Sequence, residues 1–364
     1  MLETIRAFVA EQLAARPDAA QIQQRHAGYY RGLAEQADRP LRGSGQNQWL
    51  ERLEAEAGNL AAAVRWSLAQ DPGPLPHLFR VLWTFWFLRD HMREGGSWVT
   101  QLLPAADLLD PQARVELAWT ALVTALDVGD DEAALAASQR LESLLPGIET
   151  PFLRAVSQLA MAWSSPIAGD FDGALQAAAE SLEELRGLDE PFWTALAVGS
   201  VGTLENIFSR YDDALRHLRE ARDLGDRFGS TWLAAWSRVQ LGTLFILRGD
   251  LRQARAHLDE ALELSVAARS TASVTLCLAA YARLATAEGD PGRAALLAGA
   301  AEGLRRRAGL RLWPTLRPAE AELVTEVRQM LGAERFDQAF SSGSGLSQRE
   351  AVTAARSPRG TDAS

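Results

Sequence analysis

Apolar residues recur along most of the chain with the spacing of a helix face. In one stretch Leu241, Leu244 and Phe245 precede a short polar turn, and Leu251 and Leu258 follow it. Apolar residues three, four and seven positions apart lie on one side of an α-helix. The alternating β-branched runs that are typical of strands are not found. The pattern therefore predicts an all-α protein.

The helical stretches repeat with a period of 40 residues. The repeated turns are Gly129-Asp130, Gly169-Asp170, Ser209-Arg210, Gly249-Asp250 and Gly289-Asp290. Five residues after each first turn position stand Ala134, Ala174, Ala214, Ala254 and Ala294. Seven residues before it stand Ala162, Gly202, Gly242 and Ala282, with Leu122 as the exception. A third column holds Ala221, Ala261 and Ala301, with Ser181 small and Leu141 large. Small residues in register let antiparallel helices cross closely, so the repeat unit is a helix pair.

The turn chemistry agrees with this reading. Glycine suits the left-handed residue that ends one helix, and aspartate caps the start of the next. The Gly-Asp-x-x-x-Ala box distinguishes the repeat from HEAT and armadillo repeats of similar length, and it is typical of a lengthened tetratricopeptide repeat (TPR). We predict a right-handed superhelix of TPR-like helix pairs.

Composition shifts divide the chain into five parts. We expect an N-terminal helical connector over 1–70, with a loop at 39–45 followed by a single helix over 49–70, and a divergent capping repeat over 71–111. Five helix pairs fill 112–308, and a C-terminal helical cap entered through Pro314 and Pro318 covers 309–340. Because Ser, Gly, Arg and Thr dominate beyond Ser341, we expect 341–364 to be a mostly disordered tail.

Charge and rare residues exclude several classes of function. The chain has 47 acidic and 37 basic residues and a net charge of −10, which opposes direct nucleic-acid binding. Every basic residue is arginine, so lysine-dependent phosphate loops and Schiff bases are excluded. The single Cys277 is expected in the core, in a reducing cytoplasm. Residues 1–6 lack the apolar core of a signal peptide, so we expect none there, and the most apolar stretch, 78–88, is too short to cross a bilayer.

Motifs for catalysis, metals or cofactors are not found in the sequence. The five histidines are His26, His77, His91, His217 and His257, and none has metal-ligand spacing. The basic run Arg305-Arg306-Arg307 is interpreted as complementing the end of a helix. We therefore expect no catalytic, cofactor or metal site and no enzyme activity. A cryptic hydrolase built from scattered carboxylates and histidines is the unfavoured alternative.

A concave groove is where the sequence places binding. In TPR folds the first helix of each pair lines the concave face. Repeat register projects inward a set that we take as the partner or effector groove: Trp163, Leu196, Thr203, Asn206, Trp236, Thr243 and Arg283. Trp163 and Trp236 are the foremost anchor candidates, since aromatic residues dominate interface energetics. The alternative is that either Trp belongs to the core between repeats.

Segments outside the repeats resemble one regulator family. The matching segments, in order, are 2–6 (LETIR), 25–30 (RHAGYY), 49–56 (WLERLEAE), 59–63 (NLAAA), 88–98, 294–308 and 346–352. They resemble the C-terminal helical, MalT-like region of actinobacterial STAND-type ATPase transcriptional regulators, the antibiotic-regulatory and large LuxR-like activators.

This resemblance implies a cytoplasmic sensor or protein-interaction domain that binds a protein, peptide or small-molecule effector on its concave face. In the family a nucleotide-binding module and a winged helix come before this region. The present chain begins at the family's Leu-Glu-Thr segment, so we expect that part to be encoded upstream or lost. The alternative is a free-standing adaptor for a peptide or partner helix. Apolar surface left by a missing neighbour makes a homodimer through residues 1–70 a further hypothesis.

Overall fold

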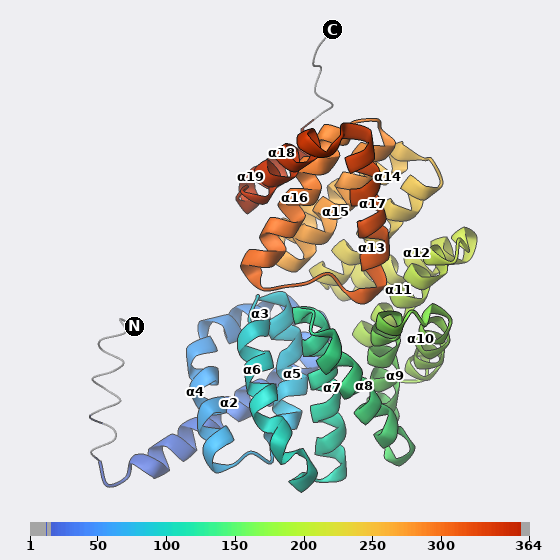
Figure 1. Cartoon of the computed structure of the whole chain (residues 1–364). Helices are drawn as coiled ribbons and strands as arrows, with labels where there is room; N and C mark the ends of the chain where they lie inside the picture. Colours follow the sequence, from blue (N-terminus) through green and yellow to red (C-terminus); the bar gives the residue numbers. More distant parts are fainter. Residues whose placement is uncertain (1–11, 13–15, 358–364) are drawn as a thin grey trace.

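The computed structural model describes residue 12 and residues 16–357, and all regular elements in this part of the chain are helices (Figure 1). The first are α2 (Ala19–Leu41), α3 (Gln46–Ala55), α4 (Ala57–Gln70), α5 (Leu75–Leu88), α6 (Met92–Leu102) and η1 (Leu103–Leu108). The repeat region holds α7 (Pro111–Val128), α8 (Asp131–Leu144), η2 (Leu145–Gly147), α9 (Pro151–Ser164), η3 (Ser165–Ala168), α10 (Phe171–Arg186), α11 (Pro191–Ile207), α12 (Tyr211–Phe228), α13 (Thr231–Leu247), α14 (Leu251–Ala267), α15 (Thr271–Ala287) and α16 (Pro291–Ala308). The last are η4 (Pro314–Leu316), α17 (Arg317–Leu331), α18 (Ala333–Ser344) and α19 (Gln348–Arg356).

The all-α prediction is confirmed, and TPR-like helix pairs form the body of the fold. Within the repeat region the pairs are α7/α8, α9/α10, α11/α12, α13/α14 and α15/α16. Figure 1 shows α2–α8 as one half of a curved superhelix and α13–α19 as the other, joined through α9–α12.

The small-residue columns lie where paired helices cross. The repeated alanines 134, 174, 214, 254 and 294 are all 0% exposed. A Cβ on Gly202 would lie 2.9 Å from Leu218 Cγ, and one on Gly242 would lie 2.7 Å from Leu258 Cδ2. These separations are too short for a methyl group, so glycine sets the distance between the two helices of a pair.

The turns have the predicted chemistry. Gly129, Gly169, Gly249 and Gly289 have φ between 75° and 80°, and Ser209 takes the same left-handed conformation at φ 58°. The following aspartates each accept a hydrogen bond from the backbone N–H three residues later, as Asp130 does from Ala133 at 3.0 Å. Arg210 makes no such cap.

The superhelix curls so far that its N-terminal helices contact the N-terminal ends of α11 and α13. Trp83 of α5 stacks on Trp193 of α11 with 6.0 Å between ring centroids, and Phe87 of α5 meets Trp232 of α13 at 5.3 Å. The Ser230 hydroxyl, at the start of α13, donates to Gln46 Oε1 at 2.8 Å. Helix α5, the most apolar stretch, is therefore a buried element that closes one end of the concave face.

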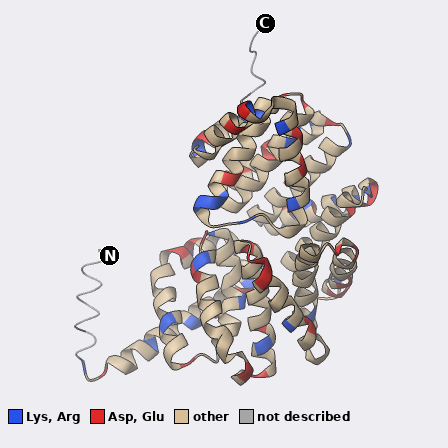
Figure 2. Cartoon of the chain, viewed as in Figure 1, with Lys and Arg blue, Asp and Glu red and all other residues tan. Residues whose placement is uncertain are grey.

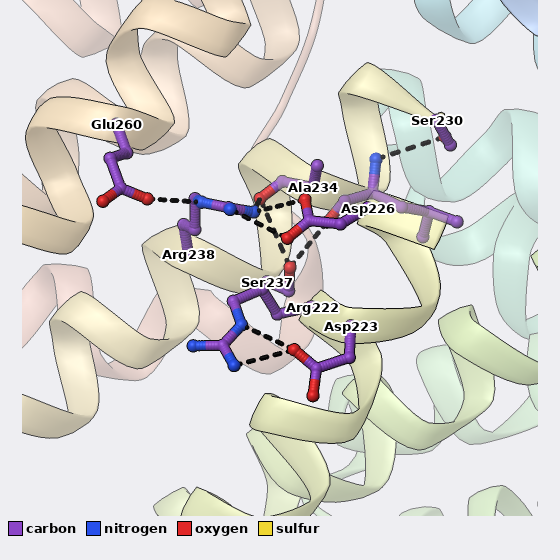
Figure 3. Close-up of polar contacts among 9 residues, drawn as sticks. Arg222, Asp223, Asp226, Ser230, Ala234, Ser237, Arg238 and Glu260 are labelled. Atoms are coloured by element: carbon purple, nitrogen blue, oxygen red, sulfur yellow. Dashed lines mark hydrogen bonds and ion pairs between the residues drawn. The ribbon is translucent and has the colours of Figure 1, made fainter. Parts of the chain in front are cut away.

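An ion-pair network on α13 links three successive helices (Figure 3). Arg238 donates to both carboxylate oxygens of Asp226 on α12 at 2.9 Å, and to Glu260 on α14 at 2.8 Å. Burial lowers the pKa of this guanidinium, but its hydrogen bonds to the two acids outweigh that effect and the pKa is raised. The network joins one helix pair to the next.

Three expectations about local structure are corrected. The expected loop at 39–45 begins later, because α2 continues through Pro40 to Leu41, which is 1% exposed in the core. The single helix expected over 49–70 is broken at Glu56 into α3 and α4.

The expected disorder beyond Ser341 is wrong for 341–344 and 348–356, which lie in α18 and α19. Gly343 brings α18 against the backbone of α16, and Ala351 and Ala355 of α19 are fully buried.

Candidate binding site on the concave face

Residues 310–316, here named the inner strap, join α16 to α17 and lie along the concave face. Leu310 is 5% exposed, and Pro314 is also buried. The Arg311 backbone N–H donates to the Asp127 carbonyl oxygen of α7 at 3.0 Å. Contacts of η4 with α9 and η3 continue the docking along the repeats. The concave face is thus occupied by a segment of the same chain.

Trp313 is the anchor of the strap. Its indole meets the Trp163 ring at 4.8 Å and the Phe87 ring at 6.1 Å between centroids. Its Nε1 donates to Asp127 Oδ1 at 2.8 Å, while Trp83 Nε1 donates to Oδ2 at 3.2 Å. Asp127 is only 1% exposed. Burial raises the pKa of Asp127 to about 7, against the two indole hydrogen bonds, which lower it.

Glycines and one ion pair fix the path of the strap. Gly309 ends α16 at φ 72°, and a Cβ on Gly129 would lie 2.4 Å from Arg311 Cγ. Arg317, at the far end of the strap, donates to Leu312 O at 2.7 Å and pairs with Asp131 at 2.6 Å. The strap is therefore held at both ends against the α7–α8 turn.

A small aromatic cavity of about 80 Å³ remains between the strap and the inner helices. Its walls include Phe87, Trp163, Trp232, Trp236 and Trp313. Trp232 is 5% exposed and Arg305, also in the lining, is 4% exposed. Trp232 Nε1 and Arg305 Nη1 are buried donors with no hydrogen-bond partner in the described part of the chain. Both donor atoms are covered by protein and are not exposed to the cavity, so its aromatic walls favour an apolar occupant.

A second cavity of about 360 Å³ is bordered by the strap and by helices α11, α13, α15 and α17. It shares Thr203, Gln240 and Leu312 with the first cavity, so the two are adjacent. Burial lowers the pKa of the Arg283 guanidinium in this cavity, and the nearby acids Glu320, Glu322 and Glu326 oppose that shift. Asn206 Oδ1 is buried there without a partner among the described residues.

The predicted groove residues line these two cavities. Trp163, Leu196, Thr203 and Trp236 border the first, and Thr203, Asn206, Thr243 and Arg283 border the second. Trp163 is 4% exposed and donates to Ser200 Oγ at 3.1 Å. Trp236 is half-buried and stacks on Trp232 at 5.9 Å. Both Trp residues line the first cavity, where Trp163 contacts Trp313 of the strap, and their role as partner anchors stays a prediction.

Sequence reasoning missed Asp127, Trp232 and Trp313. The sequence around Trp313 did indicate a buried segment, because an apolar run that contains Trp and continues into Pro314 is unusual for the exposed start of a helix. Asp127 carried none, since an acid near a helix end looks like a solvated residue.

Other singled-out residues have structural partners. Arg305 pairs with Glu302 and Glu320, and Arg307 donates to Ser344 O at 2.7 Å. Cys277 is 0% exposed, as expected, and burial raises its thiol pKa to about 12. His217 contacts Glu205 Oε2 at 2.7 Å.

In Figure 2, acidic and basic positions are interspersed along the helices. Within the described residues no three His, Cys, Asp or Glu side chains are placed to share a metal ion, and no helix has the length and apolarity to span a membrane.

Comparisons with known proteins agree with this architecture. A tetratricopeptide-repeat family model matches residues 193–267. A Mycobacterium tuberculosis protein named as an HTH-type transcriptional regulator is 34% identical over 106 residues, which span 28% of this chain and 12% of that protein; a Mycobacterium bovis protein of the same name matches equally. The chain thus covers only a small part of these relatives.

The structure of a Rap protein complexed with competence and sporulation factor is similar in fold, with TM-score 0.53, 12% identity, and coverage of 92% of this chain and 98% of that one. A STAND protein with a tetratricopeptide repeat sensor from Pyrococcus horikoshii has TM-score 0.48 and 14% identity, covering 94% of this chain and 54% of that one.

Proposed function

We propose that this chain is the sensor or protein-interaction domain of a STAND-type transcriptional regulator and that it binds its partner on the concave face. The observation that carries the proposal is the pair of adjacent cavities that aromatic and polar side chains of the inner helices line in a TPR-type fold. Sequence similarity to an HTH-type regulator over 106 residues supports the regulatory role. Binding would shift the regulator between inactive and active assemblies.

The proposal includes a cytoplasmic location, no enzyme activity and no direct nucleic-acid contact. A peptide or protein partner is favoured over a small molecule, because the face already accommodates a segment of polypeptide. Homodimer formation through residues 1–70 stays a prediction.

A photo-crosslinking experiment tests the binding face. Leu247 is 51% exposed and lines the second cavity, whereas Leu108 is 89% exposed and lies far along the chain on η1. A photoreactive phenylalanine replaces one or the other, and each full chain is irradiated in lysate of the source organism. We expect a product specific to position 247. Equal products at both positions, or none specific to 247, would refute a concave-face partner.

Gene order distinguishes the sensor hypothesis from the hypothesis of a free-standing adaptor. An open reading frame for a nucleotide-binding module directly upstream, in the same orientation, supports a sensor that works with an ATPase. An isolated gene with its own promoter supports the free-standing adaptor instead.

A further inference from the structure

The inner strap shows which kind of polypeptide the concave face accepts. It presents Trp313 and Pro314 between leucines, and each of these features has a matching surface. The indole N–H meets the Asp127 carboxylate at 2.8 Å, and the ring lies against Trp163. Leu310 and Pro314 are buried on either side. The match is chemical as well as steric, because a buried carboxylate requires a donor there.

The strap also leaves part of the surface unfilled. Beside it remains the 80 Å³ cavity, whose walls include Trp232 and Trp236. A segment of similar sequence with one more apolar side chain in this cavity would bury more apolar surface than the strap does.

We propose that the surface beneath residues 310–316 is the binding site for an extended partner segment with a Trp–Pro pair flanked by leucines, and that the inner strap is its built-in competitor. The inference rests on the proposed function and adds the chemistry of the partner. A tethered segment acts at an effective concentration of about millimolar. The strap therefore blocks weak ligands, and a partner whose additional side chain fills the cavity displaces it.

The test uses a peptide of residues 309–317 (GLRLWPTLR), labelled with a fluorophore, and full-length chains. In the Trp313→Ala chain the strap loses its anchor while the groove walls remain. We expect the peptide to bind this variant about tenfold or more tightly than wild type, because the competing segment is weakened. Fluorescence anisotropy measures both affinities, and circular dichroism and thermal unfolding verify that the variant is folded.

Matched controls separate specific recognition from adhesion. The same peptide with alanine in place of its tryptophan should lose binding to the Trp313→Ala chain. Arg317→Ala removes the ion pair with Asp131 and the hydrogen bond to Leu312 O but keeps the Trp313 anchor, so it should give a smaller gain in peptide binding. This milder variant keeps the proposal testable if Trp313→Ala does not fold.

Two results would overturn the proposal. One is a folded Trp313→Ala chain that binds the two peptides equally or binds neither. The other is N-acetyltryptophanamide competing as well as the full peptide, which would reduce the site to an indole pocket. The peptide assay uses this chain alone, so it is independent of the photo-crosslinking experiment. If the peptide assay fails but a crosslinked product specific to position 247 forms, only the Trp–Pro chemistry of the partner is rejected. Success here without that product would reject only the regulatory partner.

Discussion

The buried carboxyl of Asp127 makes stability depend on pH in an unusual direction. Asp127 is 1% exposed, and burial raises its pKa from 3.8 to about 7, although hydrogen bonds from Trp83 and Trp313 favour the charged form. The folded protein therefore holds this proton more tightly than the unfolded chain does. Stability from this group is fully present below about pH 4 and is lost as the pH rises to about 7.

The size of the effect follows from the shift. Each pKa unit corresponds to about 1.4 kcal/mol, so the full window is worth about 4 kcal/mol. Between about pH 5 and about pH 8 the free energy of unfolding should fall by about 2–3 kcal/mol from Asp127 alone. Replacement by asparagine removes the titration and keeps one oxygen as an acceptor for an indole.

Urea unfolding followed by tryptophan fluorescence measures the effect in wild type and in Asp127→Asn. Taking the difference between the two proteins cancels the titration of the other acids. We expect the variant to lose about 2–3 kcal/mol less than wild type over that pH range. The same pH dependence in both, within about 0.5 kcal/mol, would refute the assignment of a raised pKa to this carboxyl.

Three further predictions concern packing, thiol reactivity and the ion-pair network. Gly299→Ala should lower the free energy of unfolding by about 1–3 kcal/mol or more in thermal unfolding, since the new Cβ would lie 2.1 Å from a carbonyl oxygen of α18. The control Gly28→Ala on α2 meets no atom within 4 Å, so it should be neutral or stabilising. Equal losses of stability in the two variants would contradict the close crossing of α16 and α18. Cys277 should react with Ellman's reagent only on unfolding, whereas an added Leu108→Cys should react at once; fast reaction of native wild type would show that the thiol is accessible. Arg238→Met should cost about 1–2 kcal/mol in urea unfolding at low salt and less at high salt, and a loss independent of salt would assign its role to packing instead.

The repeat architecture was predictable because its determinants are local and recur. Ala254 and Gly242 mark a helix crossing by their size alone, and Gly249-Asp250 specifies a turn through left-handed φ and capping. Five copies in one register made these signals additive. The same register predicts Trp163 and Arg283 on the concave face, and in the structure they line the first and the second cavity, respectively.

The strap was not predictable because its docking depends on a distant residue. Trp313 reaches Asp127 across 186 positions of sequence, and no local pattern pairs the two. The tail was misread for a related reason. A glycine such as Gly343 in a Ser-rich segment is typical of disorder by composition. In the structure this glycine lets α18 approach the backbone of α16 closely.

Amide hydrogen exchange at Arg311 tests most directly whether the strap occupies the concave face. Its N–H donates to Asp127 O at 3.0 Å, whereas the neighbouring Leu312 N–H makes no backbone hydrogen bond among the described residues. With the strap docked, the Arg311 amide should exchange about 100-fold or more slowly than in an unstructured peptide, and the Leu312 amide should be much less protected. Exchange of the Arg311 amide at the unstructured rate would contradict a docked strap, and with it the account of a concave face that carries its own competitor.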